Sequence, residues 1–132
     1  MNSKLLNSLK TVIEKFNYLN NKELFFFSEN TQHSNLDNDI KSIANFRNGE
    51  SNIDKIQYYK DSILTIVCLN CSDKIIRFVN SKYNDNIIIL IVPSKFQFDI
   101  FVKKIASSYI DTIVWNNSIG YYIIIVNNQQ FS

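Results

Sequence analysis

NIIILIVPSKFQFDIFVKKIASSYIDTIVW, residues 86–115, is the stretch that decides the fold. It opens with six consecutive apolar residues, 87–92, which predict a strand. Apolar side chains then recur at positions 98, 101, 102 and 105, and this helical spacing predicts a helix over 94–108. The β-branched run at 110–115 predicts a second strand. Because crossover connections are right-handed, a strand–helix–strand unit of this kind predicts parallel strands with the helix on one face.

The rest of the chain extends this unit. Helical spacing predicts helices over 3–19, 35–47 and 72–83, and β-branched or aromatic runs predict strands over 23–28, 63–70 and 121–126. The segment 50–62 is ambiguous, and IQYYK (56–60) within it is typical of a short edge strand. The apolar side of the first helix is expected to pack on the protein's own sheet.

These elements predict a single α/β domain over residues 1–132. We expect a three-layer, open and mainly parallel sheet with helices on both faces. Strands 110–115 and 121–126 are close enough in sequence to form an antiparallel edge hairpin near the C-terminus. That hairpin would place an antiparallel strand at one edge of the sheet.

Composition limits the class of protein. A chain of 132 residues with 45% apolar and 20% charged residues is typical of one globular domain. The longest apolar run is too short to span a membrane, and the N-terminal residues do not predict a signal sequence. The sequence has 21 Ile and 19 Asn but only 2 Ala, 2 Gly and 2 Arg, which indicates an AT-rich genome, as in organelles, endosymbionts, parasites, viruses or phages. A net charge of +2 excludes a strongly basic nucleic-acid binder, so any RNA contact must be local.

The sequence contains no set of residues that predicts catalysis, a cofactor or a bound metal. Cys68 and Cys71 form one CxxC pair, but His33 is the only histidine and no second cysteine pair exists to complete a zinc site. We expect both cysteines to be reduced structural thiols, with Cys68 in the core. No glycine-rich phosphate loop and no Ser/His/acid set is present. We therefore expect a protein that is not an enzyme, with no evident small-molecule substrate.

The turn Pro93-Ser94-Lys95 is the place where an anion is most plausible. It follows the carboxyl end of a predicted strand and begins a predicted helix, whose free N–H groups favour negative charge. Ser94 is expected to cap this helix, and a role as phosphate ligand is the alternative. Lys103 and Lys104 add a modest basic face to the same helix. The aromatic residues occur within apolar runs, so they are expected in the core rather than on a base-stacking surface.

The order of several short motifs resembles a known family. Arg47-Asn48-Gly49 precedes a strand and a helix, Pro93-Ser94-Lys95 joins the next strand to a longer helix, and Trp115 ends the strand after that. Over residues 46–122 this order is similar to that of the second small-subunit ribosomal protein family of bacteria and organelles, although that family has Gly-Thr in place of Pro93-Ser94.

The resemblance implies a structural component of a divergent, organellar small ribosomal subunit or another ribonucleoprotein. Its partners would be other proteins of the assembly and ribosomal RNA, with no membrane contact, and its compartment would be reducing and intracellular, such as the mitochondrial matrix. The implied RNA or anion contacts are Arg47, Ser94, Lys95, Lys103 and Lys104.

Two other classes of protein agree with the sequence. One is a small protein–protein interaction or regulatory module of viral or phage origin, which would use the helix at 3–19 or an exposed sheet edge. The other is a phosphate- or nucleotide-binding α/β enzyme with its site at the turn 93–95.

Overall fold

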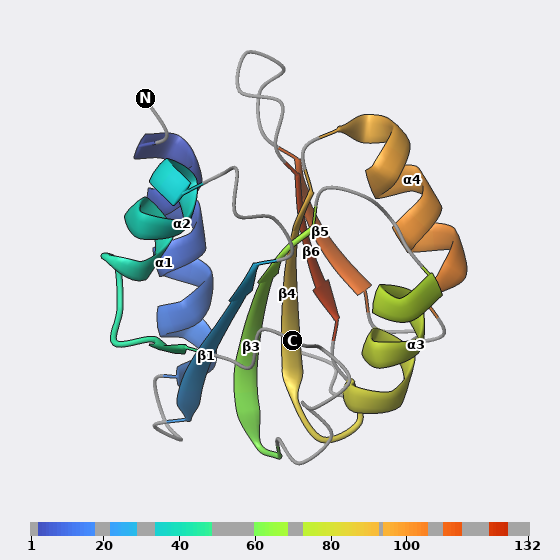
Figure 1. Ribbon diagram of the computed structural model, residues 1–132, viewed down its shortest axis with the longest axis horizontal. Coiled ribbons are helices and arrows are strands. Elements are labelled where there is room, and N and C mark those ends of the chain that lie inside the picture. Colours follow the sequence, from blue (N-terminus) through green and yellow to red (C-terminus); the bar gives the residue numbers. More distant parts are fainter. Residues whose placement is uncertain are drawn as a thin grey trace.

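The protein folds into one six-stranded sheet between two layers of helices (Figure 1). The computed structural model describes residues 3–17, 22–28, 34–48, 60–68, 73–92, 94–105, 110–114 and 122–126. In these ranges the helices are α1 (Ser3–Asn17), α2 (Ser34–Lys41), α3 (Asp73–Lys82) and α4 (Lys95–Lys104). The strands are β1 (Glu23–Ser28), β2 (Arg47–Asn48), β3 (Ser62–Val67), β4 (Ile87–Val92), β5 (Ile110–Val114) and β6 (Tyr122–Val126). The predicted three-layer α/β architecture is confirmed.

The strand order, β2-β1-β3-β4-β6-β5, explains how the helices divide between the two faces. From β1 to β2 the chain moves toward one edge of the sheet, and from β3 through β4 to β5 it moves toward the other. Right-handed crossovers in opposite directions place their helices on opposite faces. Accordingly α2 lies with α1 on one face, while α3 and α4 cover the other (Figure 1).

The two central strands are buried along their whole length because both of their faces are covered. All six residues of β3 and all six of β4 are buried. Alternate side chains point to opposite faces, so Leu64 and Ile66 pack toward α3 and α4, while Ile63 and Val67 pack toward α1 and α2. This double burial accounts for the continuous apolar runs in the sequence.

The C-terminal hairpin lies at the sheet edge as expected, but its strands are arranged differently from the prediction. The antiparallel strand β6 is inserted between β4 and β5, with Ile124 opposite both Leu90 and Thr112. The predicted antiparallel edge hairpin is therefore confirmed, with β5 as the edge strand, while β6, which runs against its neighbours, lies inside the sheet. The connection from β4 through α4 to β5 leaves one strand position open between β4 and β5. Strand β6 occupies this position, and all five of its residues are buried.

The predicted helix over 35–47 ends early. The structure has α2 only to Lys41, after which the Ile43 N–H donates to the Ile40 carbonyl at 3.2 Å in a tighter turn. Arg47 and Asn48 then pair with β1 as the short parallel strand β2. Phe46 contacts Phe26 edge to face, with ring centroids 6.1 Å apart. Pairing with β1 thus overrides the helical pattern in this segment.

Other boundaries are closer to the prediction. The helix predicted over 94–108 is α4, which ends at Lys104, and Ile105 follows in an extended conformation. The predicted strand at 56–60 lies outside the described residues apart from Lys60, which precedes β3. No helix in the described ranges is long and apolar enough to cross a bilayer.

Candidate nucleic-acid interface

The Ser94 side chain forms the N-cap of α4. Its backbone is extended, with φ −145° and ψ 154°, and its Oγ accepts a hydrogen bond from the Gln97 backbone N–H at 3.2 Å. The first helical bond runs from the Phe98 N–H to the Ser94 carbonyl at 3.0 Å. The expected capping role of Ser94 is confirmed. Its hydroxyl satisfies one of the helix N–H groups that an anion would otherwise bind.

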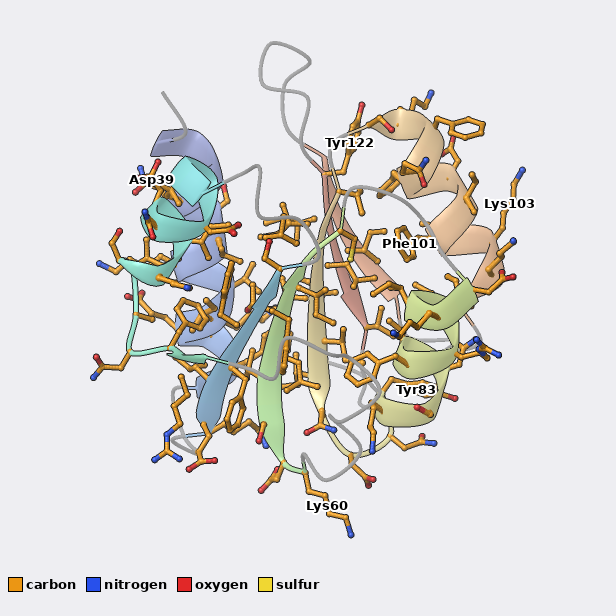
Figure 2. All side chains as sticks on the ribbon, in the orientation of Figure 1. Asp39, Lys60, Tyr83, Phe101, Lys103 and Tyr122 are labelled. Atoms are coloured by element: carbon orange, nitrogen blue, oxygen red, sulfur yellow. The ribbon has the colours of Figure 1, made fainter. Side chains whose placement is uncertain are left out.

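The remainder of α4 separates into a buried and an exposed side. Phe101 and Ile105 are buried, and Phe98 and Val102 pack against the same core. Phe98 also contacts Tyr122 of β6, with ring centroids 5.2 Å apart. In Figure 2 the Phe101 side chain points to the sheet, whereas Lys103 points away from it.

The exposed side of α4, here called the outer face, consists of Lys95, Phe96, Asp99, Lys103 and Lys104. Phe96 is 70% exposed, and it is the one exposed large apolar side chain in the part of the chain that the structure describes. The expectation that the aromatic residues belong to the core is therefore wrong for Phe96. The other phenylalanines of α4, Phe98 and Phe101, face the core. Phe96 is exposed because its position lies on the side of the helix that points away from the sheet.

Helix α3 lies beside α4 and extends the basic surface. The Asn80 side-chain amide donates to the Lys104 carbonyl at 3.3 Å, which ties α3 to the last turn of α4. Ile75, Ile76, Phe78 and Val79 bury one side of α3 in the core. Arg77 is exposed on the other side of this helix and was not among the residues predicted from the sequence.

The positive charge of the chain is unevenly distributed between the two helical layers. Helix α3 has three cations and one carboxylate, and α4 has the same, so the α3–α4 layer carries +4. Helix α1 carries +2 and α2 carries −1, so the α1–α2 layer carries +1. The net charge of the whole chain is only +2. One face of the protein is therefore considerably more basic than the total charge indicates.

Four cations of the α3–α4 layer have no ion-pair partner within the described ranges: Arg77, Lys95, Lys103 and Lys104. By contrast, the Arg47 guanidinium lies 3.3 Å from a carboxylate oxygen of Glu23. An unpaired cation can contact a phosphate without first breaking an ion pair. The charge on the α3–α4 layer is thus available to an anionic partner.

The predicted contact residues do not form one site. Lys95, Lys103 and Lys104 lie together on α4, and Ser94 caps the same helix. Arg47 lies on β2, at the opposite edge of the sheet from the hairpin. There it borders a pocket of about 440 Å³ that also involves Ile13, Leu24 and Glu23. The structure therefore separates Arg47 from the basic residues of α4.

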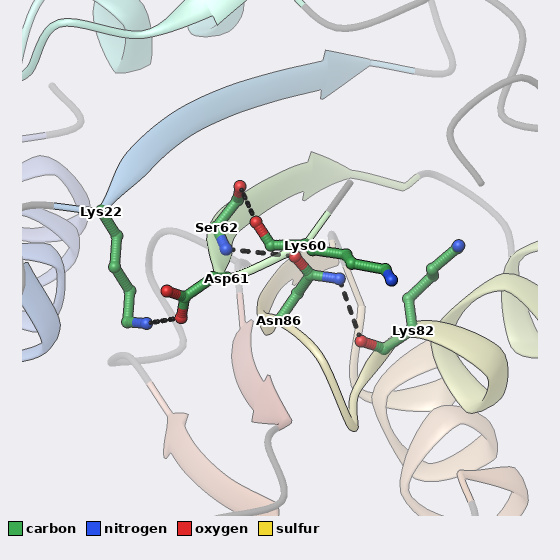
Figure 3. A network of polar contacts seen from close by, with 6 residues as sticks. All are labelled: Lys22, Lys60, Asp61, Ser62, Lys82 and Asn86. Carbon is green, nitrogen blue, oxygen red and sulfur yellow. Dashed lines mark hydrogen bonds and ion pairs between the residues drawn. The ribbon is translucent and has the colours of Figure 1, made fainter. Parts of the chain in front are cut away.

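A second group of polar contacts lies at the other end of the strands, where β3 and β4 begin (Figure 3). Asn86 bridges the Ser62 N–H and the Lys82 carbonyl, and Lys22 forms an ion pair with Asp61. Every one of these side chains is satisfied by a neighbouring segment of the same chain. The network joins structural elements to one another, which accounts for Asn86, Lys22 and Asp61 without a ligand.

The prediction that Cys68 lies in the core is confirmed. Cys68 is fully buried beneath α3, and its thiol donates a weak hydrogen bond to the Ile66 carbonyl at 3.9 Å. Cys71 and His33 lie outside the described residues. Among the residues that are described, no three His, Cys, Asp or Glu side chains lie close enough together to hold a metal ion.

The N-terminal helix uses its apolar side internally. Leu9, Val12, Ile13 and Phe16 are buried in the cluster between α1, α2 and the sheet. This confirms the expectation that the helix packs on the protein's own sheet. A partner helix could not bind the same side of α1 without opening the core.

No known protein-family model matches this chain, and no curated protein sequence is significantly similar to it. The geometry of the α3–α4 layer is therefore the basis for a functional proposal.

Proposed function

We propose that this protein is a non-enzymatic component of a ribonucleoprotein that contacts RNA through the α3–α4 layer. The observation that carries the proposal is the concentration of charge, +4 on two adjacent helices of a chain whose net charge is +2. Phosphate contacts by Lys and Arg supply most of the sequence-independent affinity for nucleic acids.

The unpaired state of the cations supports RNA over a purely structural role. Surface lysines stabilise a fold by pairing with carboxylates or by lying in the last turn of a helix, as Lys103 and Lys104 do, and either contribution is small for exposed side chains. Arg77, Lys103 and Lys104 have no such partner among the described side chains. Asn80 joins α3 to the last turn of α4, so the two helices that carry these cations lie next to each other.

The more specific form of the proposal is a divergent small ribosomal subunit, in agreement with the order of motifs over residues 46–122. The protein would then bind ribosomal RNA and neighbouring proteins in a reducing compartment, the mitochondrial matrix in the organellar case. Co-sedimentation with small ribosomal subunits that persists at high salt supports this assignment. Recovery of the protein only at the top of the gradient contradicts it.

The RNA contact itself is tested by two charge reversals of equal size. Lys103→Glu with Lys104→Glu alters the α3–α4 layer, and Lys10→Glu with Lys15→Glu alters exposed lysines of α1 on the other face. Both double variants change the net charge by the same amount. We expect the α4 pair to weaken binding of a labelled RNA on the order of tenfold or more and the α1 pair to leave it within about twofold.

Salt dependence provides a second readout of the same contact. The slope of log affinity against log salt concentration falls by about 0.7 for each phosphate contact that is lost on a single strand. The α4 double variant should therefore show a smaller slope than the wild type, measured by fluorescence anisotropy. Equal effects of the two pairs would mean that total charge, and not the α3–α4 layer, determines binding.

A further inference from the structure

The outer face of α4 combines an exposed aromatic ring with cations on both sides of it. Phe96 is 70% exposed, Lys95 precedes it directly, and Lys103 lies two helical turns further along the same side. Because an α-helix rises 1.5 Å per residue, the Phe96 and Lys103 positions are separated by about 10 Å along the axis. A phosphate backbone that follows the helix could contact both lysines while Phe96 lies between them.

The ring of Phe96 has no structural role that explains its exposure. It belongs to neither core cluster, whereas Phe98 and Phe101 of the same helix both pack inward. Covering the exposed ring with a partner removes apolar surface from water and is therefore favourable. The cations around it make an anionic partner with an apolar surface the best chemical match.

Unpaired RNA has this combination of properties. In a duplex the base faces are stacked inside the helix, so a protein meets only phosphates, sugars and base edges. In a loop or single strand the base faces are accessible and stack on aromatic side chains, and the phosphates remain available to lysines. Asp99 lies one turn from Phe96 on the same face. Its negative charge repels a phosphate, so a neutral base is the favoured group at that position.

We infer that Phe96 is a base-stacking residue and that the partner of the outer face of α4 is unpaired RNA. This inference rests on the proposed RNA contact and specifies its ligand. Lys95 and Lys103 bind phosphates on either side of the base that stacks on Phe96. A duplex of equal length binds through the same lysines but gains nothing from the ring.

Three labelled RNA probes of equal length separate stacking from charge. They are a single strand, a fully paired duplex, and an abasic single strand that keeps the phosphates without the bases. The wild type should bind the single strand more tightly than the other two. Phe96→Ala should weaken single-strand binding roughly 5- to 150-fold and leave the duplex and abasic affinities within about twofold.

Two further variants complete the experiment. Phe96→Trp keeps a stacking surface and should retain or increase single-strand affinity. Lys103→Glu with Lys104→Glu should weaken binding of all three probes, because it removes phosphate contacts. Since Phe96 is mostly exposed, its substitutions should not alter the thermal unfolding temperature, which is measured for every variant.

The outcomes distinguish the inference from the proposal beneath it. If Phe96→Ala binds the single strand like the wild type while the lysine reversal weakens it, the RNA contact stands and stacking is wrong. If Phe96→Ala weakens binding of all three probes equally, the ring contributes to binding without stacking on a base. This result also overturns the inference. If the wild type binds none of the probes but self-associates in a Phe96-dependent manner, both are wrong and a second copy is the partner.

Discussion

At the scale of single residues, Asn86 shows how a buried side-chain amide can supply hydrogen bonds to backbone groups at the ends of a strand and a helix. It is 5% exposed at the start of β4, its Oδ1 accepts from the Ser62 N–H at 3.1 Å, and its Nδ2 donates to the Lys82 carbonyl at 3.2 Å. One side chain thus joins the start of β3 to the last turn of α3. Because buried polar backbone groups must be paired, this bridge fixes where the two central strands begin.

We expect Asn86→Ala to lower the free energy of unfolding by about 2 kcal/mol, because it removes the side-chain acceptor of the buried Ser62 N–H. The Lys82 carbonyl keeps the backbone N–H groups of Asp85 and Asn86 as donors, so the lost acceptor for Ser62 accounts for the effect. Asn84→Ala is the matched control, since Asn84 is exposed two residues earlier. Its effect should remain within about 0.5 kcal/mol. Urea denaturation measures both, and similar midpoints for the two variants would show that the Asn86 bridge contributes nothing to stability.

The neighbouring Asp61 illustrates a different use of a polar residue. It has a positive φ of 54°, a conformation that Asp tolerates better than most residues. Its N–H donates to the Asp85 carbonyl at 2.7 Å, which brings the start of β3 beside the turn before β4. The ion pair to Lys22 is largely exposed on the Asp61 side, so the backbone conformation is the more important contribution.

At the scale of elements, the N-terminus of α4 depends on Ser94. We expect Ser94→Ala to lower the free energy of unfolding by about 1 kcal/mol, because the Gln97 N–H loses its acceptor. Ser94→Asn supplies an alternative cap and should be nearly neutral. Thermal unfolding of both variants tests this. A neutral Ser94→Ala would show that water replaces the hydroxyl without loss.

Most elements were predictable because burial leaves a direct pattern in the sequence. Strands β1 and β4 match their predicted ranges, since each is a single aromatic or β-branched run. Helix α3 was recognisable from the spacing of Ile75, Ile76 and Val79. Strand β2 was not predictable, because two residues carry no periodicity and pair only through the position of β1.

The candidate interface was only partly predictable. Lys103 and Lys104 are adjacent in sequence and were recognised together, and the cap at Ser94 follows from local chemistry. Arg77 could have been found from its place opposite the apolar side of α3, but its proximity to α4 depends on the tertiary contact between Asn80 and Lys104. The exposure of Phe96 was not predictable from the sequence, because most of the aromatic residues near it in the sequence are buried.

At the scale of the whole molecule, one sheet supports two layers with different properties. The α1–α2 layer is nearly neutral and its apolar residues are buried against β1 and β3. The α3–α4 layer has a similar buried side, but its outside carries +4. The sheet therefore separates a structural face from a basic one. In the ribonucleoprotein proposed above, binding of RNA through the α3–α4 layer would leave the α1–α2 layer available to neighbouring proteins.

The α3–α4 layer packs on β6, the last strand that the structure describes. Strand β6 pairs with β4 on one side and β5 on the other, and Tyr122 of β6 contacts Phe98 of α4. Because β6 lies between β4 and β5, its loss would expose an edge of each of these two strands at once. If β6 were at the edge instead, β5 would pair directly with β4, and the pairing of β5 with the sheet would not depend on β6.

These two arrangements predict different behaviour of a truncated chain. With β6 inside the sheet, a chain of residues 1–121 lacks the strand that joins β5 to β4, so it should lose cooperative unfolding and aggregate. A chain of residues 1–127 keeps every described element and is the matched control, with cooperative unfolding expected. Circular dichroism during urea titration compares the two. If residues 1–121 unfold cooperatively with a modestly lowered midpoint, β5 pairs directly with β4, and the observed position of β6 is not what holds the C-terminal half together.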